Sequence, residues 1–475
     1  MTELIQKKMN DSAAARWTAL VLIALTMFFA YMFVDLMSPI QALIEKERGW
    51  TPDIFGTYGA SEFILNIWGF LIIAGLILDK MGVRFTGMLS ASLMLIGGVI
   101  KLIGISDWFQ TTAMAEWLNS WWVSMPASAK MACFGFMIFG CGCEMAGTTV
   151  SKAIAKWFKG KEMALAMGLE MALARVGVFA IFSISPYIAE KMGTVVAPLA
   201  FCTLLLLIGL MTFGVFCVMD KKFDKQLGAA ASDGEPEEEF KFSDLKYILT
   251  SQAFWIVALL CVLYYSAIFP FQRFAANMLQ CNLDGLTATQ AADIFRWFPI
   301  GAAAITPFLG YYLDRKGKGA TMLIGGALLL IICHLVFAFV LPETKSEPIA
   351  YATIVILGLS FALVPASLWP SVPKIVDEKI LGSAYCLIFW IQNFGLSLTP
   401  LLIGSVLSST NANNPAVIAA KAQNATLIPY DYTIPEIIFA SFGVAALLIA
   451  IYLKVVDKKK GYGLELPNIK SEEAE

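Results

Sequence analysis

Twelve long apolar runs follow one another along this chain of 475 residues. A helix needs about 20 apolar residues to cross the hydrocarbon core of a bilayer, and each run is about that long. The composition agrees, because 58% of the residues are hydrophobic and only 15% are charged, whereas soluble domains carry roughly 25% charged residues. The chain is therefore predicted to be an all-α, multi-pass membrane protein. The predicted spans are 17–38, 54–78, 84–105, 131–153, 163–187, 197–219, 251–274, 290–312, 320–341, 349–371, 382–407 and 434–455.

The composition and the motifs of the sequence argue against several other classes of protein. The net charge of -2 gives no reason to expect a nucleic acid as partner. The nine cysteines are scattered inside apolar runs and there is a single histidine, so we expect no metal site and no cofactor. No Gly-x-x-x-x-Gly-Lys-Ser/Thr motif is present, which argues against a pump driven by nucleotide hydrolysis. The polar start is followed by an apolar run too long for a signal-peptide core, so that run is interpreted as the first membrane helix.

The basic residues predict how the chain lies in the membrane. Cytoplasmic loops are enriched in Lys and Arg, and placing both termini in the cytoplasm puts most of the 34 basic residues inside. The long polar segment 220–247 then becomes a cytoplasmic linker. It separates an N-terminal six-helix unit, residues 1–219, from a C-terminal six-helix unit, residues 248–475. Neither tail carries an acidic dileucine sorting signal, so we expect the cell membrane as the location.

A short motif occurs once in each half of the chain. "GLILDKMGVR" (75–84) follows the second span and "GYYLDRKGKG" (310–319) follows the eighth, and both contain Gly-x-x-x-Asp-basic-x-Gly. Glycine permits close helix approach and a tight turn, and basic residues suit the anionic inner leaflet. The repetition at equivalent positions predicts a parallel internal repeat. Its residues are Gly75, Asp79, Gly82 and Arg84 in the first copy and Gly310, Asp314, Arg315 and Gly317 in the second.

These features resemble the major facilitator superfamily, whose transporters carry this loop signature. The resemblance implies two pseudo-symmetric six-helix bundles that rock about one central site. Four further stretches are similar to the lysosomal dipeptide transporter branch of that superfamily, and the chain is interpreted as a non-lysosomal relative of it. They are "KWFKGKEMALAMGLEMALARVG" (156–177), "YYSAIFPF" (264–271), "SLWP" (367–370) and "GSAYCLIFWIQNFGLSL" (382–398).

Glu144 and Arg175 are two charges that this pattern places inside the membrane. Glu144 lies 12 residues before Lys156, and Arg175 lies 14 residues after Lys161, so both should be about 20 Å of helix from the same surface. Each charge costs at least about 2.5–3.5 kcal/mol in such a place. Two interpretations compete: a structural ion pair between helices, or binding of a zwitterionic substrate, with Glu144 taking the ammonium and Arg175 the carboxylate. The family resemblance implies the second, with the two termini of a dipeptide as the groups held.

Other polar and aromatic residues within the spans are further candidates for the substrate cavity. His334 matches a histidine of the resembling family, although a lone helix histidine is more often structural. Asp35 could take a cationic group or a proton, or cap its helix. Glu62 and Glu170 are similar cases. Tyr264, its neighbour Tyr265, Trp369 and Gln392 are candidates for the cavity wall.

The function predicted is secondary transport of small peptides, above all dipeptides, by alternating access. A proton-linked transporter of small organic anions or other metabolites on the same fold is the alternative. A membrane enzyme is argued against, because one buried histidine does not supply a catalytic constellation. A receptor that does not transport is left open by the sequence, as are uniport and proton coupling. The expected partners are a small-molecule substrate and the lipid bilayer, without an accessory membrane subunit.

Overall fold

The computed structural model describes residues 9–159, 161–228, 248–376 and 381–467 of the chain. Within these residues all regular elements are helices, as the apolar runs predict. The long helices are α1 (Ala13–Asp35), α3 (Pro52–Leu65), α4 (Leu71–Ile105), α7 (Ala127–Phe158), α8 (Met163–Met192), α9 (Val196–Gly228), α11 (Gln252–Asn282), α13 (Trp297–Lys316), α14 (Gly319–Leu335), α16 (Glu347–Ile375), α17 (Leu381–Thr410) and α19 (Thr433–Lys460). The shorter ones are η1 (Met9–Asp11), η2 (Ser38–Ile40), α2 (Gln41–Arg48), η3 (Asn66–Phe70), α5 (Asp107–Gln110), α6 (Ala113–Asn119), α12 (Ala288–Phe295), η4 (Val336–Val340), α15 (Leu341–Thr344) and α18 (Pro415–Ala422).

The helices agree with twelve membrane crossings. Ten stretches of the described chain are long and apolar enough to cross a bilayer. One of them, Pro52–Ile105, has 54 residues, or about 80 Å of helix, which is far more than the roughly 30 Å of one crossing. Gly82 interrupts it with φ 74° and ψ 174°, so this stretch crosses twice. The twelfth crossing is α13, whose 20 residues include Asp314, Arg315 and Lys316 in the last turns.

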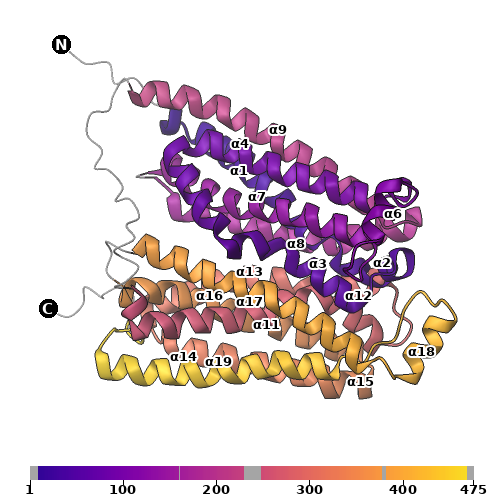
Figure 1. Ribbon diagram of the computed structural model, residues 1–475. Helices are drawn as coiled ribbons and strands as arrows, with labels where there is room; N and C mark the ends of the chain where they lie inside the picture. The colour runs from indigo at the N-terminus through magenta and orange to yellow at the C-terminus, as the bar shows by residue number, and fades with distance from the viewer. Residues whose placement is uncertain (1–8, 160, 229–247, 377–380, 468–475) are drawn as a thin grey trace, which may run out of the picture.

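The crossings form two groups that correspond to the two halves of the chain (Figure 1). In the N-terminal half α1 packs on α8 and α9, and α4 packs on α7. In the C-terminal half α11 packs on α17 and α19, and α14 packs on α16 and α19. The predicted linker 220–247 lies partly in helix, because α9 continues to Gly228; residues 229–247 lie outside the described part.

The two halves meet near one end of the helices, which we call the distal end. The opposite end, where α1 begins and α19 ends, is called the terminal end. Contacts between the halves join α3 to α17, η2 to α11, and α8 to both α12 and α13. Among the polar links, Glu190 of α8 accepts a hydrogen bond from the Thr289 hydroxyl at 2.8 Å.

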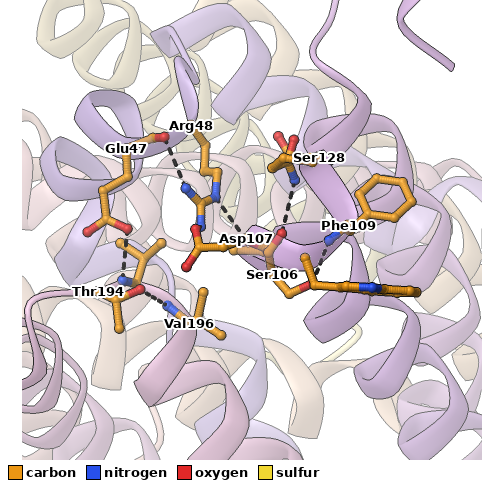
Figure 2. Close-up of polar contacts among 12 residues, drawn as sticks. Glu47, Arg48, Ser106, Asp107, Phe109, Ser128, Thr194 and Val196 are labelled. Carbon is orange, nitrogen blue, oxygen red and sulfur yellow. Dashed lines mark hydrogen bonds and ion pairs between the residues drawn. The ribbon is translucent and has the colours of Figure 1, made fainter. Parts of the chain in front are cut away.

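Side chains at the distal end also fix the short segments of the N-terminal half. Arg48, the last residue of α2, donates from Nε to the Ile105 carbonyl oxygen at 2.8 Å and from Nη2 to Asp107 at 2.5 Å. Its neighbour Glu47 accepts a hydrogen bond from the Val195 backbone N–H at 3.2 Å. Figure 2 shows these contacts at the point where α2, α5 and the start of α9 come together.

The repeated motif forms a turn at the terminal end in each half. Gly82 and Gly317 have φ of 74° and 71°, a backbone conformation that glycine adopts without a steric cost. The sequence interpretation of close helix approach does not hold for Gly75 and Gly310, because a Cβ built on either meets no atom within 4 Å.

The two copies of the motif are stabilised by different contacts. In the first copy Asp79 pairs with Lys152 at 2.8 Å, and Arg84 pairs with both Asp220 and Asp224 of α9. In the second copy Arg315 lies over the Tyr311 ring at 4.7 Å. The backbone around Gly317 packs against residues 465–467, and the Lys318 N–H donates to the Glu465 carbonyl oxygen at 3.0 Å.

Candidate substrate-binding site

Glu144 and Arg175 lie on neighbouring helices, α7 and α8, and both are half-buried. Among the described residues neither side chain forms an ion pair or a hydrogen bond. The structure therefore does not contain the structural ion pair that was one interpretation of the sequence. Two charges held within apolar helices without a direct ion-pair partner among the described residues suit a site that a charged ligand completes.

Arg175 reaches from the N-terminal half toward the C-terminal half. Its guanidinium carbon lies 5.6 Å from the centre of the Phe269 ring on α11 and 5.2 Å from that of Phe361 on α16. A guanidinium over an aromatic face is attracted by the ring quadrupole, and its planar fork can still donate to a carboxylate. The cation thus lies between the two halves.

Glu144 is positioned by a close approach of α7 to α3. One turn before it, a Cβ built on Gly140 would meet the Glu62 carbonyl oxygen at 2.0 Å, so the two helices touch there. The Glu144 carboxylate lies within electrostatic range of Glu62. Tyr31 of α1, a residue that the sequence did not single out, lies within range of Glu144, Glu170 and Arg175. We take Tyr31, Glu144, Glu170 and Arg175 as the polar side of the candidate site.

Aromatic rings of the C-terminal half form the opposite side. Tyr265 stacks on Phe269 with 5.4 Å between ring centres, and it accepts a hydrogen bond from Trp369 Nε1 at 3.2 Å. Trp369 is half-buried and stacks on Phe389 at 4.9 Å. We call Tyr265, Phe269, Phe361, Trp369 and Phe389 the aromatic wall. It includes Phe269 and Phe361, the two rings that lie under Arg175.

Tyr264 and Gln392 are placed elsewhere than the sequence interpretation proposed. Tyr264 is 2% exposed, and its hydroxyl donates to the Leu323 carbonyl oxygen inside the C-terminal bundle. Gln392 is 7% exposed and accepts a hydrogen bond from Cys261 Sγ at 3.2 Å. Both side chains join helices of one bundle, and of the adjacent tyrosines it is Tyr265 that lies in the aromatic wall.

His334 is likewise separated from the candidate site. It is fully buried, its Nδ1 lies 2.7 Å from Glu436 of α19, and it packs against Phe271 and Phe439 with ring centres 5.0 and 5.2 Å apart. In this structure it offers no surface to a substrate. Glu436, its partner, could have been found as an acid at the start of the last apolar run.

Asp35 and Glu62 form part of a buried junction between the halves. Asp35 accepts a hydrogen bond from Gln272 Nε2 at 2.7 Å, and Glu62 pairs with Arg273. Both acceptors belong to the N-terminal half and both donors to α11. We call these four residues the inter-half junction. Asp35 is thus neither an empty cation site nor a helix cap in this structure.

Two buried bases were missed by the sequence interpretation. Arg273 is 6% exposed, and its guanidinium lies 5.5 Å from the centre of the Phe136 ring. Lys101 of α4 has no exposed surface; it donates to the Tyr58 hydroxyl and lies 4.4–4.8 Å from three ring centres. The signal was available, because each is a lone basic residue inside an apolar run.

Two bundles of six helices around a site between them define a secondary transporter fold, and the comparisons give the family. The profile of the Major Facilitator Superfamily matches residues 23–400 and 284–465. This chain belongs to that superfamily. It is thus an integral, multi-pass membrane transporter.

Curated relatives give a narrower similarity. The chain is 24% identical over 412 residues to the "Lysosomal dipeptide transporter MFSD1" of Homo sapiens, which covers 83% of this chain and 81% of that protein. The protein of the same name from Danio rerio is 26% identical, over 83% and 77% of the two chains, and that from Mus musculus is 24% identical, over 95% and 88%.

Solved structures of other transporters share the fold. A bacterial homologue of the human lysosomal transporter Spinster, in an inward-facing and occupied conformation, matches with a TM-score of 0.67 at 14% identity, covering 94% of this chain and 98% of that one. A D-xylose-proton symporter matches with a TM-score of 0.65 at 14% identity, over 93% and 97%. At such identities the likeness concerns the fold alone.

Proposed function

We propose that this protein carries small peptides, dipeptides above all, across the membrane by alternating access. Glu144 binds the substrate ammonium and Arg175 binds its carboxylate. The observation that carries the proposal is that these two half-buried charges, on adjacent helices, form no ion pair or hydrogen bond with any residue that the structure describes, while Arg175 faces the other half. The relatives named as dipeptide transporters support the same substrate class.

The separation of the two charges is the proposed basis of selectivity. A free amino acid carries its ammonium and carboxylate on one carbon, and it reaches two residues on different helices less well than a dipeptide does. A tripeptide adds about 3.5 Å of extended chain, which strains a site sized for two residues. Removing either terminal charge leaves its protein partner desolvated and unpaired, at a cost of about 2–5 kcal/mol.

The aromatic wall and the inter-half junction take separate roles in this proposal. Tyr265, Trp369 and the two rings under Arg175 contact the substrate side chains. Asp35 and Glu62 hold the distal ends of the halves together through Gln272 and Arg273, and this junction must break when the protein opens at that end.

The orientation follows from the basic residues. The terminal end, with its motif turns, faces the cytoplasm of the cell and the distal end faces outward. The units that rock are the N-terminal half, which extends to the end of α9 at Gly228, and the C-terminal half, residues 248–475.

Ligand-dependent stabilisation of the purified protein tests the substrate class. A ligand raises the free energy of unfolding by roughly 2.7 kcal/mol at a hundred times its dissociation constant. We expect dipeptides to raise the melting temperature more than free amino acids, tripeptides or simple carboxylates at equal concentration. Stabilisation by simple carboxylates but not by dipeptides would favour the organic-anion alternative, and uptake of the stabilising ligand into proteoliposomes separates a transporter from a receptor.

A further inference from the structure

The segment between α4 and α7 carries an unusual concentration of exposed tryptophan at the distal end. Trp108 is 68% exposed, Trp117 57%, Trp121 44% and Trp122 95%, and Met114 beside them is 52% exposed. We call these five residues the tryptophan face. The whole chain has 12 tryptophans, so a third of them lie on this one short segment, and nothing in the described structure covers them.

The segment is a folded platform, which excludes local unfolding as the reason for the exposure. Phe109, Ala115, Leu118 and Ala127 form a small core of their own beneath it. The start of the segment is fixed where Ser106 caps α5 and Arg48 binds Asp107 (Figure 2).

The other end of the platform is fixed to α7. Lys130 Nζ donates to the Leu118 carbonyl oxygen at 2.6 Å, and Asn119 accepts a hydrogen bond from the Ala127 N–H at 2.7 Å. The chain therefore turns one side of α5 and α6 inward and holds the indole rings outward.

The tryptophan face continues an apolar surface that already meets lipid. The last turns of α4 expose Ile96, Val99 and Ile103 at 49%, 38% and 38%, and the first turns of α7 expose Phe134 at 50%. On membrane-crossing helices such side chains contact acyl chains. The platform begins at the end of α4 and ends at the start of α7, so it lies where the hydrocarbon gives way to headgroups.

We propose that α5 and α6 form an interfacial foot whose tryptophan face rests in the headgroup region of the distal leaflet. Tryptophan is the residue enriched at this depth, because its ring is amphipathic, and interfacial helices bury an apolar face in the same region. The segment 106–126 contains Asp107 and Glu116 and no basic residue. The foot therefore binds through its indole rings and does not select anionic lipids.

Quenching of a fluorophore at position 122 tests the proposal. The variant Trp122→Cys, in a protein whose nine native cysteines are replaced, is labelled with bimane and reconstituted into phosphatidylcholine liposomes. Trp122 is almost fully exposed, so its replacement leaves the fold intact. Glu116→Cys is the matched control, because this polar residue is exposed on α6, in the same segment and six residues before Trp122.

We expect phospholipids brominated near the top of the acyl chains to quench the label at 122 by more than twofold, while aqueous iodide quenches it at least threefold less than the label at 116. Adding 20% anionic lipid should not change these ratios. Equal quenching of both positions by iodide would overturn the proposal, since the face would then be open to water or to a partner protein. Protection of position 122 from both quenchers would overturn it as well, because another protein surface would cover the face.

Discussion

The ion pair between Glu62 and Arg273 crosses from one half of the protein to the other. Both side chains are almost fully buried, at 5% and 7% exposure. Lys101 lies within electrostatic range of Glu62, and Asp35 lies within range of Arg273. Two acids and two bases thus meet at one place. A buried pair of this kind adds little net stability, but losing one partner leaves an uncompensated charge.

Breaking the pair from one side is predicted to open the distal end. Glu62→Gln or Arg273→Gln alone should cost about 3–5 kcal/mol, whereas the double variant should cost less than the sum of the two. A cysteine at Ser397, a buried residue of α17 that bonds to the Ala60 carbonyl oxygen, reports the opening by faster labelling with an aqueous thiol reagent.

Asp107→Asn provides the control for this prediction. It removes an ion pair at the same end, but the Asp107 carboxylate is 80% exposed and the pair lies within one half, so it should cost less than about 1 kcal/mol and leave labelling at 397 unchanged. Strictly additive costs of the two junction variants would show that the pair does not couple the halves.

Single residues could be chosen as site candidates from the sequence only where their chemistry is unusual for their surroundings. Glu144 and Arg175 could be singled out because a charge inside an apolar run needs a reason. The same argument also applied to Lys101 and Arg273, which were missed. Tyr264 and Tyr265 are adjacent and chemically identical, and only the rotation of α11 decides which of them lies in the aromatic wall. His334 and Glu436 are 102 residues apart, so their pairing depends on the packing of α14 on α19.

At the scale of the helix, α4 and α7 are held together by a glycine crossing. A Cβ built on Gly97 would lie 2.4 Å from the Gly135 carbonyl oxygen, and one built on Gly135 would lie 2.5 Å from the Gly97 carbonyl oxygen. Small residues let membrane helices approach closely, which is the main source of packing energy between them.

Gly135→Val should therefore force α4 and α7 apart. We expect a melting temperature lower than that of the unchanged protein by several degrees, with weaker substrate binding because Glu144 is on α7. Gly75→Ala in α4 is the matched control, since a Cβ there meets nothing within 4 Å. An unchanged melting temperature for Gly135→Val would mean that the crossing adapts without cost.

Most of the helices could be predicted to within about five residues from apolar length alone, because a bilayer requires about 20 such residues per crossing. Besides the end of α9, two bounds were further off: α11 was predicted to end at 274 and continues to Asn282, and the span predicted from 290 begins in α12, with α13 starting only at Trp297. The exceptions have physical reasons. The linker was placed from residue 220, but α9 continues through Asp220 and Asp224, which bind Arg84. The charged residues after 219 end the apolar pattern, so the sequence predicted the end of the helix at that point. Ion pairs with Arg84 stabilise the helix beyond it. The short α5 and α6 carry no such length signal and could not be predicted.

For the molecule as a whole, the repeated motif predicted the two halves correctly. What the repeat could not show is which ends of the halves touch, because this depends on the conformational state. The orientation in the membrane also needs a direct test. In a background without native cysteines, Ser120→Cys at the distal end should react with an impermeant thiol reagent in intact cells. Lys222→Cys should react only after permeabilisation, and the reverse pattern would contradict the proposed topology.

The central claim is that Glu144 and Arg175 each bind one terminus of the substrate, and pairing each variant with the matching capped ligand tests it most directly. Binding of a free dipeptide, its N-acetyl form and its C-amide form is measured to the unchanged protein and to the folded variants Glu144→Gln and Arg175→Gln. In the unchanged protein each cap should weaken binding by about 2–5 kcal/mol. In Glu144→Gln acetylation should cost almost nothing while amidation keeps its full cost, and Arg175→Gln should show the opposite. Equal costs of each cap in all three proteins would contradict the account.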